Sequence, residues 1–165
     1  MSRRRVLVMA LLGFTLLLGS VERVSAVDFL GEFCWSVTLT EGTTGPTPGP
    51  TYLYRLGVTQ MDGSRYSLQG DRVLTASPVP PPFPVAPGFI HAGAIVSGSA
   101  VIITGNATYD GIPDYPGRTV RSIRFQLTLP TLSGTYWDMA TTFDTVGRTF
   151  TESYTAGPAT FTVCP

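Results

Sequence analysis

A strict alternation of apolar and polar side chains constrains the fold of this chain more than any other feature. Residues 33–40 read Phe-Cys-Trp-Ser-Val-Thr-Leu-Thr, a period of two that is typical of a half-buried β-strand. No run in residues 27–165 shows helical periodicity. Strands are predicted at 33–40, 51–60, 65–74, 89–97, 100–109, 119–129, 134–143, 148–155 and 159–164.

Turn signals separate these stretches at short and regular intervals. Asp62-Gly63 and Ser97-Gly98-Ser99 each lie between two alternating runs, which favours hairpins. Consecutive hairpins predict an all-β fold, an antiparallel up-and-down β-barrel, with a β-sandwich as the second choice. The count is eight strands if 148–164 is one bent strand with a bulge at Gly157-Pro158, and nine if it is two.

The first 26 residues have the order of a signal peptide, so residues 27–165 are predicted to form a single domain. Arg3-Arg4-Arg5 precedes the apolar run Val6–Leu18, and Val24-Ser25-Ala26 fits the small-x-small cleavage rule. Ser2–Leu7 also resembles a twin-arginine signal, which leaves the export route open. We therefore expect an exported protein, in the bacterial periplasm or outside the cell.

The chain has two cysteines, and export favours their pairing in one disulfide. Cys34 and Cys164 both fall on the polar faces of the first and last predicted strands. A Cys34–Cys164 bond would therefore lie on the outer face of the sheet and join its first strand to its last. This pairing predicts a sheet closed on itself.

Charge and motifs exclude several classes of function. Basic and acidic residues number 11 each and there is no lysine, so cleavage after Ala26 leaves a slightly acidic domain. Such a surface offers no footprint for nucleic acid and no polybasic patch for a membrane, and no membrane insertion is expected after cleavage. His91 is the only histidine, and no nucleophile or phosphate-loop motif occurs. We expect neither an enzyme, nor a metal, nor a cofactor.

Aromatic side chains on the predicted inner faces are the candidates for ligand contact. In 134–143 the parity places Trp137, Met139 and Phe143 inside and Asp138 toward solvent. These aromatic residues would either line a cavity or fill a dry core. The candidate ligand-binding residues are Trp35, Tyr52, Tyr54, Tyr66, His91, Arg121 and Trp137.

An exported eight-stranded meander with an aromatic first strand resembles the lipocalin and avidin barrels. Gly31-Glu32-Phe33 has the spacing of the Gly-x-Trp that opens both families, with Phe in place of Trp, and Trp35 follows two residues later. The resemblance covers the architecture of 31–164 and implies a calyx for a small apolar or aromatic molecule. The sequence thus predicts a non-enzymatic small-ligand binder; the alternative is a structural or surface-interaction protein with a filled barrel.

Overall fold

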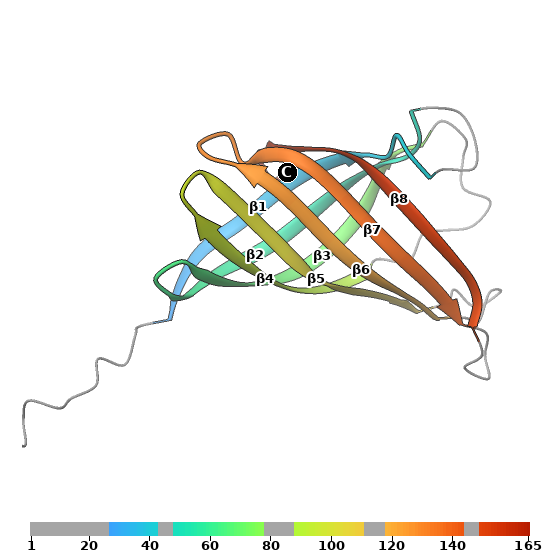
Figure 1. Ribbon diagram of the computed structural model, residues 1–165, viewed down its shortest axis with the longest axis horizontal. Helices are drawn as coiled ribbons and strands as arrows, with labels where there is room; N and C mark the ends of the chain where they lie inside the picture. Colours follow the sequence, from blue (N-terminus) through green and yellow to red (C-terminus); the bar gives the residue numbers. More distant parts are fainter. Residues whose placement is uncertain (1–26, 43–47, 78–87, 111–117, 144–148) are drawn as a thin grey trace, which may run out of the picture.

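The computed structural model is an all-β barrel, and it describes residues 27–42, 48–77, 88–110, 118–143 and 149–165. Eight antiparallel strands follow one another around the barrel in sequence order, and the last pairs with the first (Figure 1). The strands are β1 (Asp28–Thr38), β2 (Thr51–Asp62), β3 (Arg65–Ala76), β4 (Gly88–Ser97), β5 (Ala100–Asp110), β6 (Arg118–Thr128), β7 (Ser133–Phe143) and β8 (Thr149–Thr162). The predicted fold class is confirmed; the predicted signal peptide, residues 1–26, lies outside the described residues.

The final stretch of chain is a single strand, so the count is eight and not nine. β8 continues through Gly157-Pro158 with consecutive pairs to β7, Tyr136 with Gly157 and Thr135 with Pro158, so the bulge expected there is absent from this ladder. A side chain at position 157 would collide with the backbone carbonyl of Thr38. Glycine is needed there because the two backbones approach closely at the seam between β1 and β8.

The seam between β1 and β8 is short and is fastened by the predicted disulfide. Only four residue pairs join the two strands in the ladder, Cys34–Val37 with Thr162–Ala159. Cys34 and Cys164 are bonded, with Cα atoms 5.3 Å apart, which confirms the pairing. Cys34 has the parity of the outer face, opposite to Trp35, yet is fully buried beneath the half-exposed Cys164.

The inner faces of the strands form one continuous apolar core. Its members follow the predicted alternation on β1, β2, β3 and β6, where Trp35, Tyr54, Leu68 and Phe125 are all nearly inaccessible to solvent. The core consists of Trp35, Val37, Leu39, Tyr54, Leu56, Val58, Leu68, Ile90, Ala94, Val101, Ile103, Ala107, Ile123, Phe125, Leu127, Tyr136 and Ala159.

The described part of the chain contains no helix long and apolar enough to cross a membrane.

The face assignment predicted for β7 is wrong. Tyr136 and Asp138 point into the barrel, whereas Trp137 and Met139 point out. Directly opposite residues of paired strands share a face, and Phe125 of β6 lies opposite Tyr136. The apolar face of β6 thus fixes the register of β7, and a shift of one residue would turn every side chain of the strand over.

His91 also lies on the outer face. It is exposed and meets the ring of Phe89 edge-to-face, with ring centres 4.7 Å apart. The inward side chains of β4 are those of Ile90, Ala92, Ala94 and Val96. Phe89 and His91 thus share the face that points away from the core.

Candidate functional site

An apolar cavity opens at the end of the barrel that carries the short hairpin turns. The turns β2–β3, β4–β5 and β6–β7 gather at this end, where β1 also begins (Figure 1). The cavity has a volume of about 180 Å³ and communicates with solvent. It is lined by Leu30, Phe33, Trp35, Val58, Tyr66, Leu68, Ala94, Val96, Val101, Ile103, Leu129 and Leu132. No charged side chain is among these lining residues.

A bulge in β1 brings Leu30 to the rim of the cavity. Phe29 pairs with Thr59 and Gly31 with Val58, so Leu30 is an extra residue in the ladder. Gly31 has a φ of 116°, a conformation that L side chains rarely adopt. Bulges of this kind re-aim side chains, and here the bulged leucine lines the cavity while remaining half-exposed.

The turn between β6 and β7 contributes another part of the rim. Leu132 has a φ of 50°, which for a leucine costs on the order of 1–2 kcal/mol. The indole N–H of Trp35, which itself forms part of the cavity wall, donates a hydrogen bond of 2.9 Å to the carbonyl of Leu132. This bond ties β1 to a turn 97 residues away in sequence and holds Leu132 against the core.

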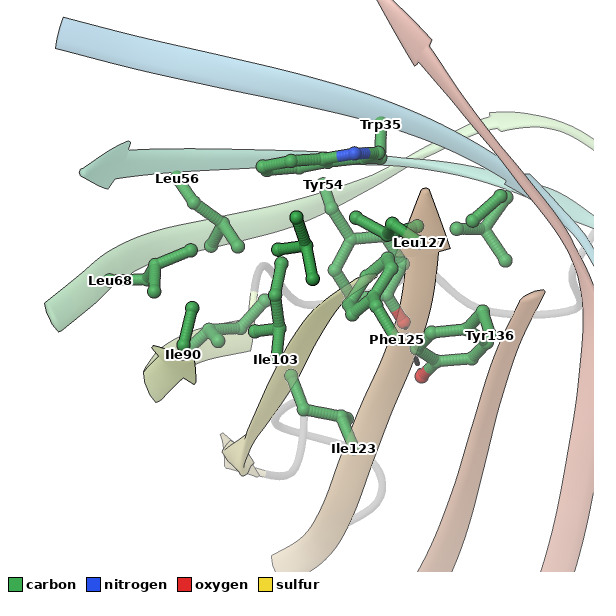
Figure 2. Close-up of a cluster of buried hydrophobic side chains, with 14 of the residues drawn as sticks. Trp35, Tyr54, Leu56, Leu68, Ile90, Ile103, Ile123, Phe125, Leu127 and Tyr136 are labelled. Carbon is green, nitrogen blue, oxygen red and sulfur yellow. Dashed lines mark hydrogen bonds between the residues drawn. The ribbon is translucent and has the colours of Figure 1, made fainter. Parts of the chain in front are cut away.

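Three aromatic rings fill the middle of the barrel below the cavity. Figure 2 shows the rings of Tyr54, Phe125 and Tyr136 meeting between strands from different sides of the barrel. Their centres lie 4.9–5.2 Å apart, at distances typical of favourable aromatic pairs. Trp35 joins this aromatic plug from above, 5.9 Å from Phe125. Trp35 also lines the cavity, so it is the residue through which the plug meets the cavity wall.

A chain of hydrogen bonds runs beneath the plug and ends on a buried carboxylate. The Tyr54 hydroxyl donates to that of Tyr136 over 2.5 Å, and the Tyr136 hydroxyl donates to Asp138 Oδ2 over 2.6 Å. Thr155 donates to Asp138 Oδ1 over 2.7 Å, and the Arg121 guanidinium contacts both carboxylate oxygens at 2.8 and 3.0 Å. Asp138 is fully buried, so these donors replace the water it would otherwise require.

Burial holds both tyrosines of this network in their neutral form. Burial raises the pKa of Tyr54 above its ordinary value, although the nearby Arg72 guanidinium acts in the opposite direction. Burial raises the pKa of Tyr136 well above the ordinary value, and the hydroxyl of Tyr54 and the carboxylate of Asp138 raise it further. Both hydroxyls are therefore donors in a fixed chain at neutral pH.

Tyr54 and Tyr136 are expected to ionise only when the barrel unfolds. Because their pKa values are raised in the folded state, the stability that they contribute is fully present below about pH 10 and is lost as the pH rises toward the folded values. A spectrophotometric titration should show at least two of the seven tyrosines ionising together with the loss of β-sheet circular dichroism.

A variant with both Tyr54→Phe and Tyr136→Phe provides the control for this titration. Its late step should be smaller by two tyrosines. Smooth ionisation of every tyrosine in the folded wild-type protein would show that the pair is accessible and that the network is misplaced.

The structure divides the sequence-predicted ligand residues into three groups. Trp35 and Tyr66 line the cavity. Tyr52, Tyr54 and Arg121 point into the barrel but lie in its other half, away from the cavity. Tyr54 is part of the plug, and Arg121 binds Asp138. The Arg72 guanidinium stacks on Tyr52, 4.1 Å from the centre of its ring. His91 and Trp137 lie on the outer face, where the Arg124 guanidinium sits 5.5 Å from the Trp137 ring centre.

Sequence reasoning missed the aliphatic majority of the cavity wall. Val58, Leu68, Ala94 and Ile103 have the inward parity of their strands and lie toward the hairpin turns. That combination of parity and nearness to a turn is visible in the sequence and would have found them. Leu30 and Leu132 carry no such signal, because a bulge and a left-handed turn residue place them.

No group of three metal-ligating side chains occurs among the residues that the structure describes.

Fold and cavity together define a disulfide-fastened, eight-stranded antiparallel barrel with an apolar cavity at one end. Comparisons of the chain with models of protein families, with curated proteins and with solved structures find no match. The likeness to lipocalin and avidin barrels stays a prediction from the sequence.

Proposed function

We propose that this protein binds one small, neutral, apolar molecule in the cavity and does not transform it chemically. The observation that carries the proposal is the cavity itself, about 180 Å³ in volume and lined by apolar and aromatic side chains from β1 to β5 and the β6–β7 turn. An apolar cavity of about 150 Å³ suffices to bind benzene. The ligand is therefore of about the size of one ring.

The lining argues for a neutral ligand. A charged group moved from water into this cavity would lose its hydration and find no opposite charge on the wall. The indole N–H of Trp35 is engaged with the carbonyl of Leu132, so it does not offer a donor to an anion. Asp138 and its tyrosine partners, which belong to the plug, are absent from the cavity wall, and this supports a binding role over a catalytic one.

An exported location is part of the proposal. The Cys34–Cys164 bond is compatible with an oxidising compartment, and the order of residues 3–26 fits a signal peptide. A neutral apolar molecule partitions poorly into water, so a carrier in the bacterial periplasm or outside the cell would raise its soluble concentration. This is the setting in which a single-cavity barrel is most useful.

A surface-interaction protein is the second candidate. It is favoured by exposed apolar side chains on the outer face, among them Phe89 and Ile95 on β4 and the neighbouring Met139 and Tyr154 on β7 and β8. Large exposed apolar patches mark interaction sites, whereas single exposed residues are ordinary. A ligand that binds in the cavity distinguishes the first candidate from the second.

Filling the cavity is expected to abolish ligand binding. Ala94 is a buried wall residue, and Ala94→Phe would place a ring in the space of the ligand. Isothermal titration with toluene should show binding to the wild-type protein and at least about tenfold weaker binding, about 1.4 kcal/mol, to the variant. Benzoate, the anionic counterpart of toluene, should bind to neither.

Thr104→Phe is the matched control, because Thr104 lies exposed on the adjacent strand next to the wall residue Ile103 but faces outward. This variant should bind toluene as the wild-type protein does. Toluene binding that survives in Ala94→Phe, or binding of benzoate equal to that of toluene, would contradict the assignment of the cavity as the site.

A further inference from the structure

We propose that Leu132 is the gate of the cavity, and that it sets both the largest ligand admitted and the rate at which the ligand leaves. This inference rests on the proposed function, since it concerns access to the same cavity. It goes beyond that function by assigning size selection to one residue of the β6–β7 turn and the holding of that residue to Trp35.

The rim and the depth of the cavity differ in their exposure to solvent. The deep wall, for example Leu68 and Ile103, is buried in regular strands. Six wall residues remain partly exposed and form the rim: Leu30, Phe33, Tyr66, Val96, Leu129 and Leu132. Three of these rim residues are leucines, and a ligand that enters from the hairpin end must pass the rim.

The rim leucines stand on irregular backbone, where movement does not break a strand ladder. Leu30 is the bulged residue of β1, and Leu129 and Leu132 belong to the turn after β6. Leu132 alone has the left-handed backbone, with a φ of 50°, that brings its side chain against the core from a turn. The position of the Leu132 side chain at the rim therefore depends on the backbone conformation of Leu132 itself.

Several hydrogen bonds hold the turn in place. The amide of Leu132 donates to the carbonyl of Thr128 over 2.8 Å, and the amide of Leu129 donates to the carbonyl of Ser99 over 2.8 Å. Trp35 adds the bond from the cavity side, from its indole N–H to the carbonyl of Leu132. A ligand in contact with the Trp35 ring is therefore in contact with the side chain whose hydrogen bond positions Leu132.

The test compares two neutral probes, toluene with one ring and 1-methylnaphthalene with two. Affinities are measured by isothermal titration and dissociation rates by ligand-observed nuclear magnetic resonance exchange. Leu132→Ala shortens the side chain to its Cβ. Leu132→Gly removes the side chain altogether and suits the positive φ at this position. Trp35→Phe removes the indole N–H that bonds to the carbonyl of Leu132. Thr131→Ala is the control, because Thr131 is exposed in the same turn and does not line the cavity.

The wild-type protein and Thr131→Ala should bind toluene and exclude 1-methylnaphthalene. Both Leu132 variants should release toluene at least about tenfold faster and admit 1-methylnaphthalene, and Trp35→Phe should release toluene faster. Circular dichroism checks that each variant is folded, and Leu132→Gly keeps the test decisive if Leu132→Ala does not fold. If toluene binds and the Leu132 variants keep the wild-type release rate and size limit, the gate is wrong and the proposed function stands. If toluene does not bind to the wild-type protein, both are wrong.

Discussion

Replacing Asp138 by alanine is expected to destabilise the barrel by about 3–5 kcal/mol. The carboxylate is fully buried and accepts hydrogen bonds from Tyr136, Thr155 and Arg121. Its removal leaves two hydroxyls without their acceptor and takes the carboxylate away from a largely buried guanidinium, whose side chain is 20% exposed. Urea unfolding followed by circular dichroism measures the effect.

Asp71→Ala is the matched control for this substitution. Asp71 pairs with Arg55 over 2.7 Å across two neighbouring strands, but both side chains lie on the outer face and are substantially exposed. Surface ion pairs contribute about 0–1 kcal/mol, so this variant should unfold close to the wild-type midpoint. Equal destabilisation by Asp138→Ala and Asp71→Ala would contradict the buried network.

Removing the disulfide with the double substitution Cys34→Ala and Cys164→Ala is expected to cost up to about 4–5 kcal/mol in the chain-entropy model. The bond closes a loop with a sequence separation of 130 residues, nearly the whole domain, and such long loops gain most from a cross-link. It also fastens a seam that the β1–β8 ladder holds with only four residue pairs. Thermal and urea unfolding of the oxidised wild type and the double variant give the difference.

Thiol titration of the unfolded, unreduced protein checks the bond itself. The protein should show no reactive thiol until a reductant is added. Two reactive thiols per chain would refute the pairing, and an unchanged unfolding midpoint in the double variant would show that the seam does not depend on it.

Most of the fold could be predicted because alternation and turn residues act locally. Strands expected at 51–60, 65–74 and 100–109 appear with boundaries shifted by at most two residues. The closure of the barrel followed from one long-range clue, the shared parity of Cys34 and Cys164.

β7 shows where local reasoning ends. By its sequence the face of Trp137 and Met139 is the more apolar one, yet pairing with the neighbouring strand β6 places the other face inside the barrel. Trp137 is therefore outside, and Asp138 is inside because Tyr136, Thr155 and Arg121 satisfy it. No property of residues 134–143 alone contains that information.

The candidate site was predictable only in part, for a related reason. Ligand contacts were expected from aromatic residues, and two of these, Trp35 and Tyr66, do line the cavity. Tyr54 instead packs into the plug, where its hydroxyl bonds to that of Tyr136. This partner was not foreseen, because the face prediction for β7 had placed Tyr136 outside the barrel. The rim depends on a bulge at Leu30 and a left-handed Leu132, and neither is encoded by hydrophobic alternation.

Native mass spectrometry of the protein exported by the cells that make it tests the central claim most directly. The wild-type protein should carry the mass of one small neutral molecule, which is released on gentle activation, and Ala94→Phe from the same cells should carry none, because its cavity is filled. The same bound mass on both proteins would place the ligand elsewhere. Bare protein in both cases, together with no binding of toluene, would contradict a ligand-binding barrel.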